Sequence, residues 1–558
     1  MNAEHLLEVY EQISEAPDAI ARLRRFVLDL AVRGKLVEQD AGDEPVAELL
    51  LAISTDKKRR AISARDRKAK AITLLPQTAD LAEIPASWSW VAFGDLTISR
   101  DGERKPVSKS DRETRDKVYD YYGASGVIDK IDGFLFDKPL LLIGEDGANL
   151  INRSTPIAFI ARGQYWVNNH AHVLDGVSEG FLKYLELFIN AIDLKPYVTG
   201  TAQPKMNQAK MNSIPVAVPP LAEQHRIVAK VDELMALCDR LEEARKSREE
   251  LRDKLTAASL ARLTAPDTTP EDFPTHANFA LEALPALTTR PDQIKTLRQT
   301  ILNLAVRGKL VEQDVADEPA AELLRKIDGE TRKKKAAKVG SDDDLLFSIP
   351  KGWASARVQD VIQPDREISY GVIKLGNEPT SGGIPTLRCS DVRPGYIETR
   401  TVRKVQEDIE AQYIRTRLEG GEVLINIRGT LGGVAHVPKA LAGYNIAREV
   451  AVVPVSEKIS AQYIVYLVLS PFFWDHIQGN LRGIAYKGLN LGTLRALPIP
   501  IPPLAEQHRI VAKVDALMAV CDRLEAALTT ADTTRTHLLE ALLHEALEPA
   551  ATALEAAE

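Results

Sequence analysis

The stretch PPLAEQHRIVAKVD decides the fold: it occupies Pro219–Asp232 and recurs letter for letter at Pro502–Asp515. A second block, LAVRGKLVEQD, occupies Leu30–Asp40 and recurs at Leu304–Asp314. The longer block recurs after 283 residues and the shorter one after 274, so the later copy carries nine extra residues between its blocks. Repetition of this length indicates an internal duplication. We therefore expect two copies of one unit, related by a pseudo-two-fold arrangement.

Both blocks lie in helical patterns. Apolar residues recur every three or four positions from Ile20 to Leu30 and from Ile294 to Leu304. After the longer block, the four–three spacing of a heptad seam runs from Ile227 and from Ile510, and it includes Cys238 and Cys521 as small core residues. Each long helix would span about 65 Å. We expect the short helix of one copy to pack on the long helix of the other.

Single residues are expected to mark the ends of the short helices. Pro17 and Pro291 stand where such a helix can start. Gly34 and Gly308 stand where it can stop, because glycine adopts the left-handed conformation that commonly follows a helix.

Between the blocks the copies diverge into β-rich segments with glycine turns, such as VYDYYGASGVIDKIDGFLF and EVLINIRGTLGGVAHV. This pattern predicts an α+β protein with two globular domains separated by long antiparallel coiled-coil helices. The predicted divisions are residues 1–80 (N-terminal helical region and basic linker), 81–218 (first lobe), 219–265 (central long helix), 266–346 (linker and second-copy helix with a basic run), 347–501 (second lobe) and 502–558 (C-terminal long helix).

Composition excludes several classes of protein. The chain has 558 residues, 45% hydrophobic and 27% charged, which fits several folded domains rather than a disordered chain. No apolar run reaches the roughly 20 residues of a membrane span, and we see no signal segment at the start. Three cysteines cannot form a disulfide framework. We therefore expect a cytoplasmic protein.

The repeated blocks and the lobe motifs resemble one known family. Each copy of PPLAEQHRIVAKVD follows a proline-alternating segment, IPVAVPP or LPIPIPP. The lobes contain YYGASG at Tyr121, IGEDGANL at Ile143, GTAQPKMN at Gly200 and INIRGTLGG at Ile425. In motif and order the chain resembles the specificity subunit of type I restriction–modification systems. It departs from that pattern at Gly483, where GIAYKGLN replaces GTAQPKMN.

The resemblance implies two target-recognition domains, each of which binds one half of a bipartite sequence in double-stranded DNA. It also implies helical spacers that set the gap and dock two modification (methyltransferase) subunits. Restriction (endonuclease/translocase) subunits join in the full complex, and no membrane partner is expected. The chain would then not be an enzyme by itself. It would bind no cofactor or metal, because S-adenosylmethionine, ATP and Mg²⁺ would belong to the partner subunits.

Two basic runs stand at equivalent places before the lobes of this chain, whose formal net charge is −8. Eight Lys/Arg stand against two Asp from Asp56 to Lys70, and seven stand against one Asp and one Glu from Arg325 to Lys338. We predict linkers that attract DNA phosphates. The alternative is a pair of solvated segments without a role in binding.

Base recognition needs side chains that reach base edges, where Arg suits guanine and Asn suits adenine. Arg428 and Asn426 are of these types, and Glu145 and Asp146 align with Ile427 and Arg428. Acidic groups there either accept from cytosine or order the loop. This reversal of charge predicts that the lobes read different half-sites. The candidate DNA-binding residues are Tyr121, Tyr122, Ser125, Glu145, Asp146, Asn149, Arg153, Asn168, Asn169, His170, Lys205, Arg388, Ser390, Asn426, Arg428, Thr430, Asn445, Arg448, Arg482 and Lys487.

Other functions find less support in the sequence. The HAH of His170 to His172 has no second ligand pair of suitable spacing, so we expect a packed or DNA-facing histidine rather than a metal ligand. We find no GxxxxGK[ST] loop, no Asn-Pro-Pro-aromatic motif and no HExxH motif. A self-contained DNA-modifying enzyme, a structural coiled-coil connector and a transcription regulator remain as alternatives.

Overall fold

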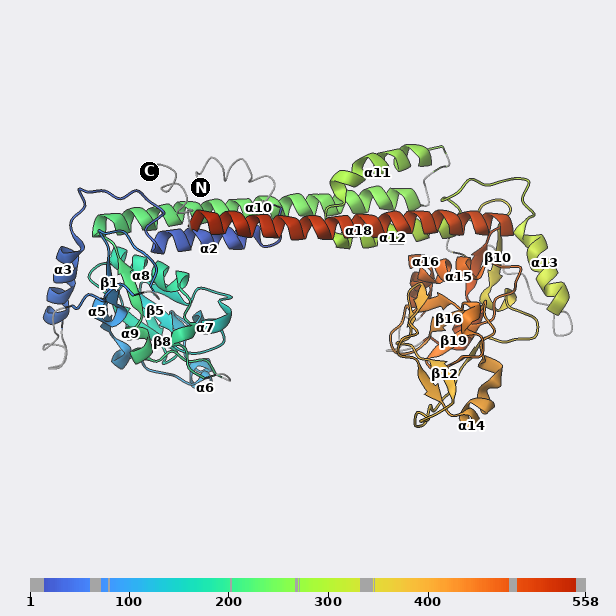
Figure 1. The fold of residues 1–558 in the computed structure, drawn as a ribbon, viewed down its shortest axis with the longest axis horizontal. Coiled ribbons are helices and arrows are strands. Elements are labelled where there is room, and N and C mark those ends of the chain that lie inside the picture. Colours follow the sequence, from blue (N-terminus) through green and yellow to red (C-terminus); the bar gives the residue numbers. More distant parts are fainter. Residues whose placement is uncertain are drawn as a thin grey trace, which may run out of the picture. The chain divides into compact units, whose positions relative to one another are not determined.

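A computed structural model describes residues 15–60, 72–78, 81–200, 203–265, 269, 271–331, 345, 347–480 and 489–547. The chain forms two compact units, Met1–Ser247 with Asp532–Glu558, and Arg248–Ala531 (Figure 1). The candidates Arg482 and Lys487 lie outside the described residues. No helix within those ranges is both long and apolar enough to cross a membrane.

Two helices of 44 residues, α10 (Leu221–Thr264) and α18 (Leu504–Leu547), confirm the long helices predicted after the repeated block. The first residues of each heptad seam are buried, as are Cys238 and Cys521 within it. Burial raises the pKa of both thiols. Both cysteines are therefore packed core residues, as the seam predicted. The coiled-coil pairing of the two long helices stays a prediction.

In the first unit, α2 (Ala19–Val32) contacts segments of both long helices. Arg24 of α2 forms a 2.7 Å ion pair with Asp239 of α10. Arg22, on the other flank of α2, forms a 2.7 Å ion pair with Glu540 of α18. The short helix of the first copy therefore packs on the long helix of its own copy as well as on the other.

The second unit repeats this arrangement with α12 (Pro291–Val306). Arg298 forms a 2.7 Å ion pair with Asp522 of α18. Arg290, which caps α12, forms a 2.7 Å ion pair with Asp253 of α10. The prediction that each short helix packs on the other copy's long helix is thus incomplete, because the heptad seam also faces the short helix of its own copy.

The first lobe contains a four-stranded sheet, a three-stranded sheet and a covering helix. Its main elements are β1 (Ser89–Ala92), β2 (Ile98–Ser99), β3 (Tyr119–Gly123), β4 (Gly126–Ile131), β5 (Leu140–Gly144), β6 (Ala158–Ala161), β7 (Tyr165–Val167), β8 (Ala171–Asp175), α8 (Glu179–Ala191) and β9 (Pro215–Val218), with short helices α5 (Phe93–Leu96), α6 (Lys109–Glu113), α7 (Asn149–Asn152) and α9 (Gln208–Asn212). The sheets have the orders β2-β8-β5-β6 and β4-β3-β7. Helix α8 lies between the larger sheet and α2 (Figure 1). Strands β1 and β9 pair where the chain enters and leaves the lobe.

The second lobe repeats the larger sheet and its covering helix. Its main elements are β10 (Ala354–Arg357), β11 (Ser369–Tyr370), β12 (Ile384–Leu387), β13 (Val392–Arg393), β14 (Tyr396–Ile397), β15 (Arg403–Val405), β16 (Val423–Asn426), β17 (Val434–His436), β18 (Asn445–Ile446), β19 (Val450–Val453) and β20 (Pro498–Ile501), with helices α14 (Glu407–Glu410), α15 (Ala461–Leu469), α16 (Pro471–Asn480) and α17 (Leu491–Ala496). The order β11-β19-β16-β17 matches β2-β8-β5-β6. Helix α15 lies between this sheet and α12, and β10 pairs with β20. The lobes therefore share one fold.

The described parts of the two basic runs are structured. Helix α3 (Val46–Arg59) carries Lys57, whose ammonium donates to the carbonyl of Gly94 at 2.7 Å. Arg60 forms a 3.2 Å ion pair with Asp175. The second run begins in α13 (Ala320–Thr331). The linker prediction is therefore wrong for these first residues of each run, and the remainder of both runs lies outside the described residues. Beside these elements, α11 (Phe273–Leu287) is a helix of the segment that joins the two copies.

A buried carboxylate joins each long helix to the strand that opens its lobe. In both copies a tryptophan Nε1 and a glutamine Nε2 donate to one glutamate side chain, at 2.6–3.0 Å. Both glutamates are 1% exposed. We call each set a latch; the first is Glu223, Trp88 and Gln39, and the second is Glu506, Trp353 and Gln313.

The glycines after α2 and α12 confirm the predicted helix ends, since Gly34 and Gly308 both have φ of 66°. The two helix starts differ, because α12 begins at Pro291 as predicted, whereas α2 begins two residues beyond Pro17, after Asp18 with φ of 59°.

Replacing Gly34 with alanine is expected to lower the stability of the first unit by at least about 1–3 kcal/mol, the cost of a strained left-handed residue. A Cβ there would also lie 2.4 Å from Cγ of Pro85. Thermal unfolding of Gly34→Ala would measure the loss. The matched control is Gly102→Ala, since no atom lies within 4 Å of a Cβ at Gly102. Equal melting of the two variants would contradict the prediction.

Candidate nucleic-acid interface

The first candidate surface lies where β5 ends, and we call residues 123–125, 145–149 and 168–170 the first tip. The N–H of Glu145 donates to the carbonyl of His170 at 2.8 Å. The carbonyl of Glu145 accepts from the N–H of Met206 at 2.8 Å. The second bond holds Met206, near the end of the GTAQPKMN segment, beside the tip. The tip has a hollow of about 290 Å³ lined by Gly123, Ala124, Ser125, Ile128, Asp146, Gly147, Ala148, Asn149, Asn168 and His170.

The second tip comprises residues 388–390, 426–430 and 448–449, where β16 ends. The N–H of Ile427 donates to the carbonyl of Glu449 at 2.9 Å, and its carbonyl accepts from Leu489 at 2.7 Å. This is the bonding pattern of Glu145 in the first tip. Ile427 and Glu145 therefore occupy equivalent positions, as the sequence alignment predicted, and so do Arg428 and Asp146.

Asp146 and His170 form a polar pair at the mouth of the first hollow. Nδ1 of His170 lies 2.8 Å from Oδ2 of Asp146. Both side chains keep surface exposure, 51% for His170 and 31% for Asp146. The pair offers a carboxylate acceptor and an imidazole to a ligand that enters the hollow.

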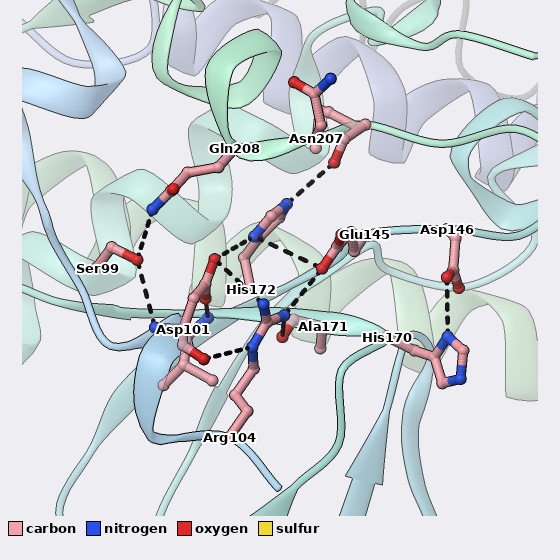
Figure 2. Close-up of polar contacts among 12 residues, drawn as sticks. Ser99, Asp101, Arg104, Glu145, Asp146, His170, Ala171, His172, Asn207 and Gln208 are labelled. Atoms are coloured by element: carbon pink, nitrogen blue, oxygen red, sulfur yellow. Dashed lines mark hydrogen bonds and ion pairs between the residues drawn. The ribbon is translucent and has the colours of Figure 1, made fainter. Parts of the chain in front are cut away.

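Beneath the first tip, the buried His172 joins three segments (Figure 2). Its Nδ1 lies 2.7 Å from Oδ2 of Asp101, and its Nε2 lies 3.0 Å from the carbonyl of Met206. Burial alone would lower the pKa of His172, but the hydrogen bond with Asp101 raises it above the ordinary value. A protonated His172 donates to both acceptors, and so fixes the loop that ends at Met206.

Glu145 belongs to the same network rather than to the surface. Its carboxylate lies 2.9 Å from Nη1 of Arg104 and 3.1 Å from Nζ of Lys205, and its side chain is 12% exposed. Burial alone would raise the pKa of Glu145, but the hydrogen bonds from Arg104 and Lys205 lower it. Of the two roles considered for Glu145, the geometry favours ordering the loop.

The second tip has a different charge. Arg428 and Arg448 are exposed, as are Thr430 and Ser390. Arg388 is held by two 3.2 Å contacts of its guanidinium with Asp391. The tip therefore offers two exposed guanidinium groups and two hydroxyls.

Asn426 supports that surface from below. Its Nδ2 donates to the carbonyls of Cys389, Val392 and Thr430 at 2.9, 3.2 and 3.1 Å. One amide thus ties the turn after β16 to the loop before β13. A Cβ at Gly433 would lie 2.2 Å from the same Nδ2, so this approach requires glycine.

Comparison with known proteins identifies the family of this chain. The type I restriction modification DNA specificity domain matches residues 85–251 and 350–531, which together exceed half of the chain. This chain belongs to that family.

Curated relatives match the specificity protein almost end to end. It is 28% identical to the EcoEI specificity subunit of Escherichia coli, over 95% of this chain and 94% of the relative. It is 27% identical to the EcoAI specificity subunit of the same species over the same shares. The HsdS subunit of Thermoanaerobacter tengcongensis aligns with 84% of this chain and 99% of its own, at 17% identity and a TM-score of 0.40.

Of the four buried sequence candidates, Tyr121, Asn426 and Asn445 lie in the interior of the specificity domains and do not belong to the interface. Tyr121 is 1% exposed and its hydroxyl lies 2.9 Å from the N–H of Val107. Asn426 is 1% exposed and Asn445 is fully buried. Nδ2 of Asn445 donates to Glu410 at 2.8 Å. All three side chains have polar partners within the lobes, which explains polar residues at core positions.

Four further candidates of the first specificity domain are buried or half-buried. Asn149 caps its own loop through Thr155, and Arg153 donates to the carbonyl of Ile192 at 2.6 Å. Burial lowers the pKa of Arg153. The half-buried Tyr122 stacks on Phe159, and the buried Asn168 accepts from the N–H of His170. The candidates that remain exposed or partly exposed at the tips are Ser125, Asp146, Asn169, His170, Lys205, Ser390, Arg388, Arg428, Thr430 and Arg448.

The network around His172 contains residues that sequence reasoning missed. Asp101 lies 71 positions before His172 and Arg104 lies 41 positions before Glu145, and no local motif marks them. Of the two histidines of HAH, His172 is packed, as one of the two alternatives predicted, and His170 is exposed. Among the described residues, no cluster of three or more His, Cys, Asp or Glu suits a metal ion.

Proposed function

We propose that this specificity protein recognises a bipartite sequence in double-stranded DNA, with one half bound by each lobe. We further propose that it works in a complex with two modification subunits, joined by restriction subunits for cleavage. The long helices and the neighbouring lobe surfaces would dock the modification subunits and set the gap between the half-sites.

The observation that carries the proposal is one fold with two different tips. Both lobes have the same four-strand order, while the equivalent positions hold Asp146 in one and Arg428 in the other. A duplicated structural spacer has no need of opposite charges at one backbone position. Direct reading of two different half-sites uses different side chains at equivalent positions, because each base pair presents its own pattern of donors and acceptors in the major groove.

We propose that the chain has no catalytic role by itself. S-adenosylmethionine, ATP and Mg²⁺ would be bound by the partner subunits. The residues of this chain would select the DNA sequence and position the complex on it. This role matches the names of the relatives, which are specificity subunits. A purified chain that transferred methyl groups to DNA without partners would contradict this.

The experiment that tests the proposal is a genome-wide map of methylated adenines in the source strain, with and without this gene. Deletion should abolish methylation at one split, non-palindromic motif. That result would also supply the target bases and the spacer length. An unchanged map, with the protein and its partner subunits shown to be expressed, would overturn the proposal.

Lengthening both long helices by one turn should lengthen the unspecified spacer of the target. Four residues inserted in each helix add about 6 Å, which corresponds to about two base pairs at 3.4 Å per pair. Methylome sequencing of the variant would measure the new spacer. A spacer of unchanged length would show that the helices do not set the gap.

A further inference from the structure

Two arginines of the second tip, Arg428 and Arg448, lie just beyond the end of one strand pair. Strands β16 and β19 are antiparallel, with Ile425 opposite Ala451 and Asn426 opposite Val450. Arg428 follows the end of β16 by two residues, and Arg448 precedes β19 by two residues in a turn, where the N–H of Val450 donates to the carbonyl of Ala447 at 3.0 Å. The N–H of Arg428 also donates to the carbonyl of Glu449, at 3.2 Å.

Neither guanidinium is neutralised by the lobe. Both residues are exposed, and among the residues that the structure describes neither side chain has a hydrogen bond or an ion pair. Some other arginines of this lobe are paired; Arg366, for example, lies 2.6 Å from Glu422. Two such charges without a partner point to an acceptor supplied from outside the chain.

The support under the pair is rigid, which limits the entropy lost when a ligand binds. The amide of Asn426 ties the turn that carries Arg428 to the loop before β13. Gly429 adopts φ of 73° and approaches Cys389, whose Sγ would lie 3.1 Å from a Cβ at this position. Arg428 is therefore presented from a fixed backbone rather than from a mobile loop.

The first lobe has uncharged or acidic residues at the two positions equivalent to these arginines, which argues against a simple phosphate contact. In the first lobe Asp146 follows the end of β5 by two residues, and Asn169 precedes β8 by two residues. Phosphate contacts carry no sequence information, and both lobes need them. If the two arginines only held phosphate, the first lobe would have no reason to replace them with a carboxylate and an amide. The difference indicates a contact that depends on the bases.

We propose that Arg428 and Arg448 read guanine in the major groove of the half-site bound by the second lobe. Arginine donates two parallel hydrogen bonds to O6 and N7 of guanine from a planar, preorganised fork, whereas lysine presents a flexible point charge of lower geometric selectivity. This assignment rests on the proposed function and adds the base class that the second lobe selects.

The test uses the complex of this chain with two modification subunits and a set of duplexes in which each specified base pair is changed in turn. Arg428→Gln and Arg448→Gln should each lose about 10- to 100-fold of the discrimination at a G·C pair, the range for one bidentate contact. The affected pairs should lie in one half-site only. Arg428→Lys keeps the charge, so it should relax discrimination while keeping the dependence of affinity on salt.

The matched control is Arg415→Gln, which removes an exposed arginine from the segment Ala411–Thr416 of the same lobe. It should leave the base preference at every position unchanged. The proposal is overturned if the two tip variants weaken all duplexes by one factor and reduce the salt slope by about one, since that is the behaviour of a phosphate contact. It is also overturned if neither half-site contains guanine. A wild-type complex that prefers no split sequence would instead refute the proposed function.

Discussion

Asp175→Asn is expected to lower the stability of the first lobe by about 3–5 kcal/mol, the usual cost of breaking a buried ion pair. Asp175 is 3% exposed at the end of β8. Its carboxylate lies 3.2 Å from both Arg60 and Arg100 and also contacts the ammonium of Lys138. Removing this buried negative charge breaks three ion pairs at once, although Arg60 keeps Asp56 and Arg100 keeps Glu103, so the cost exceeds the loss of a single contact.

The same carboxylate should make the first lobe sensitive to acid. Burial alone would raise the pKa of Asp175, but the ion pairs with Lys138, Arg100 and Arg60 lower it below the ordinary value of 3.8. The unfolded chain then binds the proton more tightly than the folded one. The stabilisation is therefore complete above pH 4–5 and is lost as the pH falls through the lowered pKa. In Asp175→Asn the stability of the first lobe should therefore depend less on pH in this acidic range.

Hydrogen exchange read peptide by peptide would measure both effects, with the second lobe as an internal reference. Asp137→Asn is the matched control, because Asp137 is exposed and forms no ion pair within the described residues. It should leave exchange unchanged. If both variants show the same exchange, or if the stability of Asp175→Asn falls on acidification as much as that of the wild type, the role assigned to Asp175 is contradicted.

Glu506→Ala is expected to cost about 1–3 kcal/mol in the second unit, because it leaves the buried Nε1 donor of Trp353 in the second latch without its acceptor. The exposed Gln313 adds little, since its Nε2 keeps the carbonyl of Gly308 at 3.2 Å. Protection of β10, β20 and the start of α18 should fall in hydrogen exchange. The first latch should stay intact, and Glu223→Ala should give the mirror-image result.

Two comparisons make this prediction specific. Glu525→Ala breaks the 2.8 Å ion pair with Arg298 on an exposed face and should cost no more than about 1 kcal/mol. Glu506→Gln keeps one acceptor oxygen and should cost less than Glu506→Ala. If alanine and glutamine at this position destabilise equally, the loss comes from packing rather than from the unsatisfied donor.

The helices could be predicted because their determinants are local or repeated. The heptad spacing from Ile227 and from Ile510, and the glycines at 34 and 308, depend on near neighbours in the chain. The strand-rich lobes could be predicted as a class. Sheet order could not, because β5 pairs with β8 across some 30 residues and no spacing rule fixes that choice. The packing of α2 on both long helices could not be predicted from the sequence either, because its one apolar stripe fits either helix.

The candidate sites were predictable in place but not in role. The alignment of Glu145 with Ile427 is supported by the matching hydrogen bonds. Residue type alone could not separate Asn426 and Asn445, which support the lobe from within, from Arg428 and Arg448, which face outward. Polar side chains satisfy hydrogen bonds in both settings, and only the fold decides which partner is available. Asp101 and Arg104 were missed for the same reason.

The paired entry and exit strands have a consequence for how such a protein changes over generations. Ser89 of β1 lies opposite Val218 of β9, and Ala354 of β10 lies opposite Ile501 of β20. Each lobe is therefore an insert whose two ends are already fastened together. Mutations between those ends can alter what is recognised without displacing the helix that follows. One half of a duplicated gene can acquire a new preference while the other keeps its own.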